Sequence, residues 1–182
     1  MADFLTCLDT FVLLNEAGNP PNYGINPDPT RDDPAAKVCA GINSEAFPAD
    51  FAAITALPIA ERPAAVSAFY QRTYWNKYIA QVNSNPVAMS VMDAEVNEGI
   101  GVGVELVQGA VNETLAKDDL IVDGVWGPRT LAGINSCTPS DLVPAFQQLR
   151  VARYRKIVED NPSEVVNLKG WIARATKPVP GI

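Results

Sequence analysis

The spacing of hydrophobic residues along the chain predicts a protein built mostly of α-helices. From Asp3 to Ala17 the apolar residues recur with a period of about 3.6 residues, as in a helix with one buried face, and Gly18 ends the pattern. The helix that follows Pro63 is expected to run through AAVSAFYQRTYWNKYIAQV, to Val82. The later helices are each predicted to start at a proline, with or without a capping residue before it, at Pro48, Pro63, Asn85-Pro86, Pro128, Thr138-Pro139 and Asn161-Pro162.

Residues 18–46 interrupt this helical pattern with a segment rich in proline, asparagine and aspartate. Proline breaks helices, and Asn and Asp favour turns, so a long irregular loop is predicted, within which a small hairpin is left open. Loops of this length inside a compact domain are usually functional or flexible. The predicted fold class is therefore mostly α, with one long loop after the first helix.

The composition narrows the class of protein and of partner. With 182 residues, 47% of them hydrophobic and 19% charged, the chain resembles soluble globular domains. Its net charge of −7 argues against sequence-independent binding to nucleic acid or to anionic lipid. No apolar run approaches the roughly 20 residues of a membrane span, so membrane insertion is not expected. Asp3 and the lack of a basic region before the first apolar stretch predict cytoplasmic synthesis without a signal peptide.

The absence of histidine limits the chemistry that the chain can perform. No Ser-His or Cys-His arrangement and no histidine metal site can exist, so acid–base catalysis must use carboxylates, lysine, tyrosine or water. The three cysteines, Cys7, Cys39 and Cys137, fit neither a disulfide framework nor zinc-ligand spacing. No metal and no cofactor are predicted.

Glu16 is a candidate general acid, because it stands at the end of an apolar helix and before the polar loop. A nonpolar surround raises the pKa of a carboxyl group, which can then donate a proton near neutral pH, as a glycosidase acid must. A second carboxylate would position water or stabilise positive charge on the sugar, and its candidates are Asp28, Asp32 and Asp33. The alternative is that Glu16 is only a helix-end residue with a local hydrogen bond.

Three further patterns have a structural and a functional interpretation. Asn26, Asp28, Thr30 and Asp32 alternate as in a calcium loop, but Arg31 replaces the turn glycine and Lys37 the closing glutamate, so calcium is not predicted. Asp93 and Asn97 lie four residues apart on one helix face and form either a structural hydrogen-bonding pair or part of a site. The aromatic residues of one helix either build the core or stack on sugar rings: Phe69, Tyr70, Tyr74, Trp75 and Tyr78.

Five fragments, in order along the chain, resemble the lysozyme-like peptidoglycan hydrolases of glycoside hydrolase family 108 with their C-terminal peptidoglycan-binding segment. Asn15-Glu16-Ala17-Gly18 stands where that family has a His-Glu-Gly-Gly motif at the end of the first helix. The other fragments are FYQRTYWNKY (69–78), VMDAEVNEG (91–99), VDGVWGPRTLAGI (122–134), and LRVARYRKI with GWIARA near the C-terminus. The resemblance implies a lysozyme-like catalytic region over residues 1–114 and a helical peptidoglycan-binding-like segment over 115–182, packed together as one compact unit.

The family pattern also separates the two copies of a Gly-Ile-Asn triplet. In the family, the corresponding Gly-Ile-Thr follows an Asp-Pro-Gly-Gly loop and precedes an aromatic-proline pair. The triplet 41–43 is preceded by residues 33–36, which correspond to the loop, and is followed by the aromatic-proline pair Phe47-Pro48. The triplet 24–26 has neither feature beside it. The second copy is therefore expected to be the counterpart of the family motif.

By resemblance, Glu16 is the general acid and Asp33 or Asp28 the catalytic aspartate. The residues expected to contact substrate are Asn15, Asn43, Tyr74, Trp75, Asp93 and Asn97. The sequence departs from the family pattern at Asn15, Ala17, Ala35, Ala36 and Val38. Val38 stands where the family has its catalytic threonine, so either another group, such as Asn22, Asn43 or Ser44, takes that role, or activity is weakened or lost.

The resemblance implies a hydrolase that cleaves glycosidic bonds in bacterial peptidoglycan, of the phage- or prophage-derived endolysin type. It would reach the cell wall after release or delivery, in association with a virion or a secretion assembly if one carries it. The alternative is a non-catalytic member that keeps the fold and serves as a wall-binding or structural part of a phage tail or secretion assembly. The departures from the motif favour this alternative.

Overall fold

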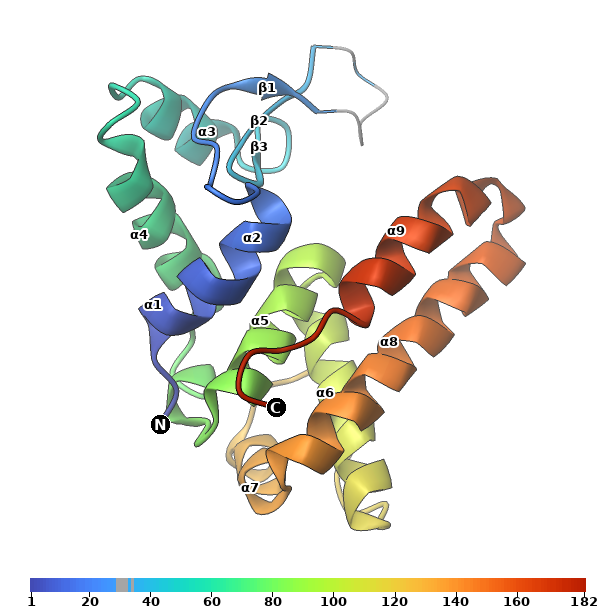
Figure 1. Ribbon diagram of the computed structural model, residues 1–182. Coiled ribbons are helices and arrows are strands. Elements are labelled where there is room, and N and C mark those ends of the chain that lie inside the picture. Colours follow the sequence, from blue (N-terminus) through green and yellow to red (C-terminus); the bar gives the residue numbers. More distant parts are fainter. Residues whose placement is uncertain (29–32, 34) are drawn as a thin grey trace. The chain divides into compact units, whose positions relative to one another are not determined.

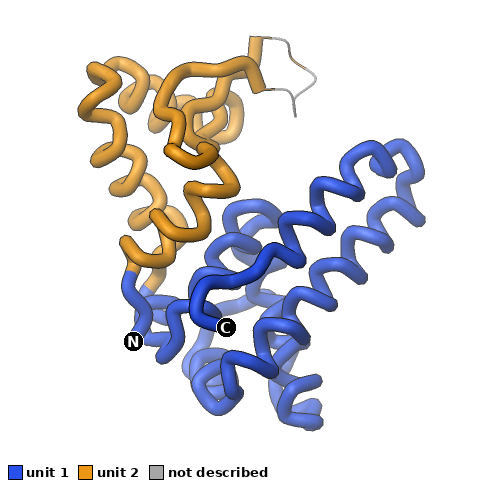
Figure 2. Tube along the Cα trace, in the orientation of Figure 1, with its two compact units in different colours: residues 1–3, 77–182 blue, residues 4–76 orange. Residues whose placement is uncertain are grey.

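The computed structural model describes residues 1–28, 33 and 35–182, and the fold over these residues is mostly helical, as predicted. The chain forms two compact units, which Figure 2 shows in different colours. Unit 2 is Phe4–Asn76, and unit 1 is Lys77–Ile182 together with Met1–Asp3. Four residues considered above, Thr30, Arg31, Asp32 and Pro34, lie outside the described part of the chain.

Unit 2 begins with a helical stretch that ends at Glu16, next to the end predicted from the sequence. It comprises α1 (Phe4–Cys7), a π-helical turn (Leu8–Val12) and α2 (Leu13–Glu16). Four apolar positions of the predicted pattern are buried, Phe4, Leu8, Phe11 and Val12. Their burial fixes the face that this helical stretch turns towards the core. Glu16 is therefore carried to the edge of the core of unit 2.

The polar segment after this helix contains the small hairpin, as part of a three-stranded antiparallel sheet (Figure 1). The strands are β1 (Asn26–Pro27), β2 (Lys37–Cys39) and β3 (Ile42–Asn43), in the order β1-β2-β3. Val38 occupies the central strand, opposite Asn26 on one side and Asn43 on the other. Strands of two or three residues are too short to show an alternating pattern, which is why the sequence left this sheet open.

Two helices complete unit 2, α3 (Pro48–Thr55) and α4 (Arg62–Tyr74). Helix α4 is shorter than predicted, because the backbone of Trp75 (φ −88°, ψ 75°) leaves the helical region. The ring of Trp75 instead packs against Phe4, with 5.5 Å between the ring centroids. The expected continuation to Val82 is wrong, and Ile79–Gln81 forms a separate 3₁₀ turn.

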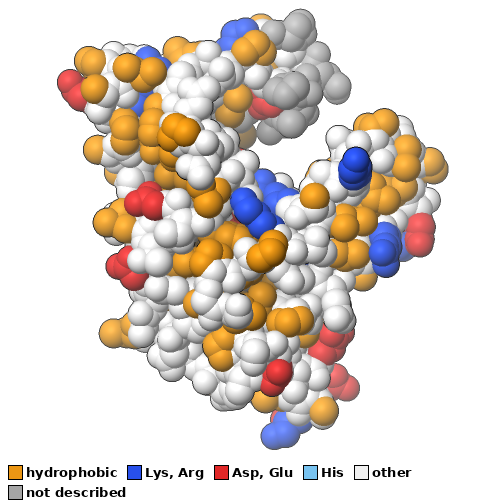
Figure 3. Space-filling model, viewed as in Figure 1, with side chains coloured by type: hydrophobic (Ala, Val, Ile, Leu, Met, Phe, Trp, Pro, Cys, Tyr) orange, Lys and Arg blue, Asp and Glu red, His pale blue; other side chains and the backbone are white. Residues whose placement is uncertain are grey.

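Unit 1 is built from longer helices, several of which begin at or next to a predicted proline, whereas those that begin at Ile100 and Val165 do not. They are α5 (Asn85–Glu98), α6 (Ile100–Leu115), α7 (Pro128–Ser136), α8 (Pro139–Asp160), a 3₁₀ turn (Pro162–Glu164) and α9 (Val165–Ala175). Helix α5 packs on α6, α6 on α8, and α8 on α9. Figure 3 shows hydrophobic and charged side chains mixed along the α8–α9 hairpin, where Val165 and Val166 are exposed.

A buried ion-pair network joins three of these helices. Asp93 of α5, which is fully buried, accepts hydrogen bonds from Arg150 of α8 (3.0 Å) and Arg174 of α9 (2.9 Å). Arg150 also donates to Glu98 at 2.8 Å, and Asn97 donates to the hydroxyl of Tyr154 at 2.8 Å. A buried charge without its partner is costly, so these contacts fix α8 and α9 against α5.

Replacing Asp93 should destabilise unit 1 severely. Asp93→Asn keeps the shape of the side chain but removes the buried negative charge that pairs with both Arg150 and Arg174, and the expected loss in the free energy of unfolding is about 3–5 kcal/mol. Asp160→Asn is the control, because Asp160 pairs with Lys156 on the surface of α8 and each side chain is 65% exposed. This control should change stability by less than about 1 kcal/mol. Urea denaturation followed by circular dichroism measures both, and equal effects would contradict the assignment.

A second buried carboxyl group lies where α5 and α6 approach closely. Glu95 of α5 is fully buried, and its Oε1 accepts a hydrogen bond from the indole Nε1 of Trp126 at 2.6 Å. A Cβ atom at Gly103 of α6 would lie only 2.9 Å from the Cγ of Glu95, so only glycine permits this packing. Burial raises the pKa of Glu95 from 4.5 to about 8, while the hydrogen bond from Trp126 opposes the shift. Glu95 is therefore protonated at neutral pH.

This shift makes the stability of unit 1 depend on pH. Folded Glu95 holds a proton that the unfolded chain releases above pH 4.5, so stability should fall as the pH rises from 4.5 to about 8. The slope contributed by one proton is at most about 1.4 kcal/mol per pH unit. Glu95→Gln removes this dependence, so thermal melts of the two proteins should converge near pH 4.5 and diverge towards pH 8. Parallel curves would contradict the assignment, and Glu113→Gln, at an exposed position of α6, is the control.

Candidate active site

The candidate site is built where the end of α2 meets the turn between β2 and β3. A Cβ atom at Gly41 would lie 2.6 Å from Oε2 of Glu16 and 2.5 Å from the hydroxyl oxygen of Tyr70. The carboxyl group and the phenol therefore converge on the bare backbone of Gly41. Glu16 is itself half-buried.

The turn that receives Glu16 has an unusual backbone. Ala40 and Gly41 connect the paired residues Cys39 and Ile42, and both have positive φ, 47° and 79°. Two-residue hairpins favour this geometry, because its twist matches that of the strands, but an alanine in it carries a steric cost. The hydroxyl of Tyr70, from α4, donates to the carbonyl oxygen of Ala40 at 3.0 Å and holds the turn in place. The turn is thus fixed by α4 on one side and occupied by Glu16 on the other.

Gly41, and not Gly24, is the glycine beside Glu16. A Cβ atom at Gly24 would instead meet the side chain of Asn22, 2.9 Å away. This geometry agrees with the expectation that the second Gly-Ile-Asn triplet is the counterpart of the family motif.

Asp28 reaches the same hairpin from the end of β1. Its Oδ2 accepts a hydrogen bond from the side-chain amide of Asn43, and its backbone N–H donates to the carbonyl oxygen of Ala36 at 3.0 Å. Asn43 is buried, and its Oδ1 accepts from the backbone N–H groups of Glu45 and Ala46, at 2.7 and 3.0 Å. The buried amide of Asn43, which lies two residues after Gly41 in the chain, therefore positions the carboxylate of Asp28.

The other predicted carboxylate, Asp33, is exposed and lies in the turn before β2. Its Oδ1 accepts from the backbone N–H of Ala35 at 2.8 Å, which is a local turn contact. Asp28, by contrast, is tied to the Gly41 hairpin through its hydrogen bond with Asn43. Asn15, half-buried, directly precedes Glu16 in α2.

The remaining predicted substrate residues lie in other surroundings. Tyr74 is buried in an aromatic cluster with Phe69 and Tyr70, with ring centroids 6.3 and 5.9 Å away. Trp75 is half-buried against Phe4. Asp93 and Asn97 belong to unit 1, where they hydrogen-bond to Arg150, Arg174 and Tyr154, as the ion-pair network shows.

Among the three groups considered as replacements for the family threonine, Asn43 is the one that contacts a candidate carboxylate. The hydroxyl of Ser44 accepts from the backbone N–H of Lys37 at 2.9 Å, and Oδ1 of Asn22 accepts from Gly24 at 2.8 Å. Both are local contacts that shape the loop. Val38, at the position of the family threonine, pairs in the sheet directly opposite Asn43.

Arg62 holds the irregular part of the loop against α3 and α4. Its guanidinium donates to the carbonyl oxygens of Tyr23 (2.9 Å), Thr55 (3.0 Å) and Leu57 (3.1 Å). The thiol of Cys39 also donates to the carbonyl of Tyr23, and burial raises the pKa of that thiol. Cys39 therefore remains a protonated core residue behind the hairpin, without the thiolate that nucleophilic chemistry needs.

Sequence reasoning missed the part played by Tyr70, which it placed only among core aromatics. A phenol in an apolar helix face is a weak signal, because the partner, Ala40, lies 30 residues away in the chain. Within the described residues, no cluster of three acidic or cysteine side chains offers a metal site. Among the described helices, none has the length and apolar character needed to cross a membrane.

Comparison with known proteins identifies both halves of the chain. Residues 15–99 match the family described as Glycosyl hydrolase 108, and residues 102–176 match the family described as Predicted Peptidoglycan domain. The fold resembles a solved structure of SagA from Brucella abortus, with a TM-score of 0.65 and 19% sequence identity over 96% of this chain and 90% of that chain. No curated protein matches the chain.

The matched segments include every fragment on which the resemblance was based, and Glu16 lies at the start of the first of them. The non-catalytic alternative is not favoured by these matches. Residues 15–99 therefore belong to the glycosyl hydrolase 108 family and residues 102–176 to the peptidoglycan-domain family, and the chain is a lysozyme-like peptidoglycan hydrolase with a C-terminal peptidoglycan-binding segment.

Proposed function

We propose that Glu16 is the general acid that protonates the glycosidic oxygen of the peptidoglycan glycan strand. The observation that carries this proposal is the packing of Glu16 against the backbone of Gly41, beside the hydroxyl of Tyr70. A carboxyl group held in one position can reach a bound glycosidic oxygen without losing rotamer freedom during the reaction. Glycoside hydrolysis needs such an acid to stabilise the departing alkoxide.

Asp28 is the second carboxylate of the proposed mechanism. Glu16 and Asp28 both approach the β2–β3 hairpin, one at Gly41 and the other through Asn43. Asp28 would position the attacking water or stabilise the positive charge that develops on the sugar ring. Asn43 acts through Asp28 as a positioning residue, since its own carbonyl oxygen is engaged by the backbone.

The biological setting that fits this activity is that of a phage- or prophage-derived endolysin. The substrate lies outside the cytoplasm, and in this setting a holin, a virion or a secretion assembly would give the enzyme access to the wall. With a net charge of −7 it would approach an anionic wall through shape, hydrogen bonds and stacking more than through charge.

Glu16→Gln should abolish most of the hydrolysis while leaving the fold intact. Glutamine has the same shape but cannot donate an acidic proton, and loss of a general acid costs about 10²–10⁴-fold in rate. Turbidity clearing of purified peptidoglycan, with zymograms as a second readout, measures the effect. Glu113→Gln, at an exposed position of α6, is the matched control and should retain full activity. Undiminished lysis by Glu16→Gln would overturn the assignment of the acid.

Gly41→Ala should impair catalysis through the position of Glu16. The added Cβ would collide with Glu16 and Tyr70, and the positive φ of Gly41 disfavours any side chain by about 1–2 kcal/mol. A displacement of about 1 Å in a reacting group can cost about 10²-fold in rate. The lysis rate and the melting temperature should therefore both fall.

Gly170→Ala in α9 is the control for this substitution, because a Cβ there meets nothing within 4 Å. It should leave both the lysis rate and the melting temperature nearly unchanged. An active and stable Gly41→Ala protein would show that the close contact with Glu16 is not needed.

A further inference from the structure

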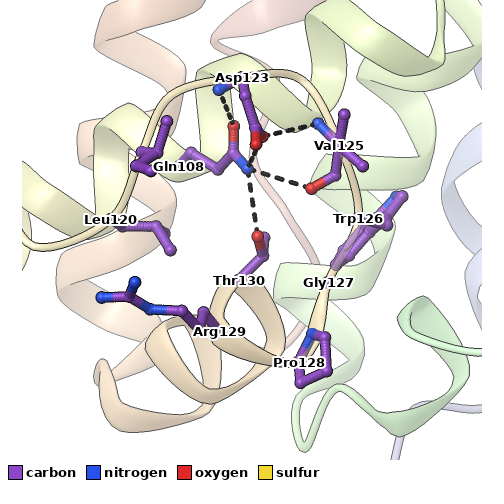
Figure 4. A pocket seen from close by; sticks show the side chains of 10 residues that line it. Gln108, Leu120, Asp123, Val125, Trp126, Gly127, Pro128, Arg129 and Thr130 are labelled. Carbon is purple, nitrogen blue, oxygen red and sulfur yellow. Dashed lines mark hydrogen bonds between the residues drawn. The ribbon is translucent and has the colours of Figure 1, made fainter.

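A cavity of about 220 Å³ lies in the peptidoglycan-binding segment, between the loop 120–127 and the first turn of α7 (Figure 4). It belongs entirely to unit 1. The loop that forms it contains the DGVWGPRT motif, which the proposed catalysis by Glu16 does not use. The wall of the cavity combines apolar and charged side chains: Leu120, Ile121, Val125 and Trp126 with Asp123 and Arg129.

One buried amide gives the loop its shape. The side chain of Gln108, from α6, is 1% exposed and makes five hydrogen bonds to the loop and to α7. Its Oε1 accepts from the backbone N–H groups of Asp123 and Gly124, both at 3.0 Å. Its Nε2 donates to Oδ1 of Asp123, to the carbonyl of Val125 and to the hydroxyl of Thr130, at 2.8, 3.2 and 3.1 Å. The cavity is therefore formed before any ligand arrives, which lowers the entropic cost of binding.

The loop is also fixed from its other end by Trp126. The indole donates to the buried carboxyl group of Glu95 and stacks on Tyr78, with centroids 6.1 Å apart and planes within 9° of parallel. The edge of the cavity that Trp126 forms is thus held by α5. Three aliphatic residues of the same loop are exposed, Ile121 (70%), Val122 (50%) and Val125 (62%). Contiguous exposed apolar surface of this kind can mark a binding site.

Two opposite charges flank the cavity. Figure 4 shows Asp123 on one side and Arg129 on the other. Oδ1 of Asp123 accepts from Gln108 and from the backbone N–H of Val125, and these bonds lower the pKa of Asp123, so it stays ionised at neutral pH. Its Oδ2 takes no part in these two bonds. Arg129 is exposed and donates from Nη2 to the carbonyl of Asp119 at 2.9 Å.

We propose that this cavity binds the peptide stem of peptidoglycan, with the side-chain amine of the stem's diamino acid at Asp123 and a stem carboxylate at Arg129. A wall stem peptide is a short zwitterion with small alanyl methyl groups, which matches two opposite charges separated by an apolar surface. A glycan strand without peptide carries no ammonium group and would leave Asp123 without a counter-charge. The proposal rests on the proposed function, because it assumes that the substrate is the wall, but it concerns binding and not cleavage.

Titration calorimetry with the full-length Glu16→Gln protein tests the proposal without interference from cleavage. The ligands are a soluble stem tetrapeptide that contains diaminopimelate and a chitin oligosaccharide without peptide. The peptide should bind, and Arg129→Gln or Asp123→Asn should each weaken its binding at least about tenfold, as expected for loss of one charge-assisted contact. Asn at position 123 can still accept from Gln108 and Val125, so the loop should keep its shape. Arg155→Gln, at an exposed position of α8, is the charge-matched control and should bind normally.

A modified ligand assigns the two contacts separately. A stem peptide whose side-chain amine is acetylated should bind the reference protein about tenfold more weakly than the free peptide. Asp123→Asn should then weaken the binding of this acetylated peptide no further, while Arg129→Gln should still do so. Failure of the peptide to bind, preference for the bare oligosaccharide, or equal losses in Arg155→Gln and Arg129→Gln would each overturn the proposal. If lysis depends on Glu16 but the stem peptide does not bind, only this inference is wrong. If the stem peptide binds as expected but lysis does not depend on Glu16, only the catalytic assignment is wrong.

Discussion

The candidate site depends on one close approach, between the carboxyl group of Glu16 and the backbone of Gly41. Because no Cβ intervenes, the end of α2 can lie directly on the β2–β3 turn, and the turn has the left-handed geometry that a glycine accepts most readily. Tyr70 supports the turn from α4 through its bond to Ala40. The position of the proposed acid therefore depends on three segments of unit 2 that are distant in sequence.

Unit 1 uses buried polar groups in a different way. Asp93 with its arginines and Gln108 with its five hydrogen bonds tie helices and loop together at places where an apolar contact would not fix orientation. Such groups are costly to bury, so their value lies in specifying one arrangement of the helices and one shape of the DGVWGPRT loop. Glu95 likewise holds the loop in one position through its hydrogen bond with Trp126, and it does so as a neutral carboxyl group.

The sequence predicted the helices of both units well, because prolines and capping residues mark where helices begin and apolar periodicity marks which face is buried. Pro128 and Pro139 are the first residues of α7 and α8, as expected. The sequence could not show that the helix ends before Trp75, because the ring contact of Trp75 with Phe4 joins residues that are far apart in the chain. The short sheet was left open because two- and three-residue strands carry no periodic signal.

For the site, the sequence proposed Glu16 and the Gly41 triplet, and it left Asp28 and Asp33 as alternatives for the second carboxylate. Our proposal of Asp28 rests on its hydrogen bond with the side chain of Asn43, which lies 15 residues away in sequence. The contacts of Gln108 with the loop likewise join residues 15 to 22 positions apart, beyond the range of any local pattern. Pairings of this kind follow from tertiary packing and become visible only in the fold.

The most direct test of the central claim is a crystal structure of the Glu16→Gln protein with a glycan fragment of peptidoglycan bound across the cleavage point. The account predicts that the side chain at position 16 lies within hydrogen-bonding distance of the glycosidic oxygen, with the Gly41 turn beneath it and Asp28 near the same sugar ring. A fragment bound with its glycosidic oxygen out of reach of position 16, and next to a different carboxylate, would contradict the account.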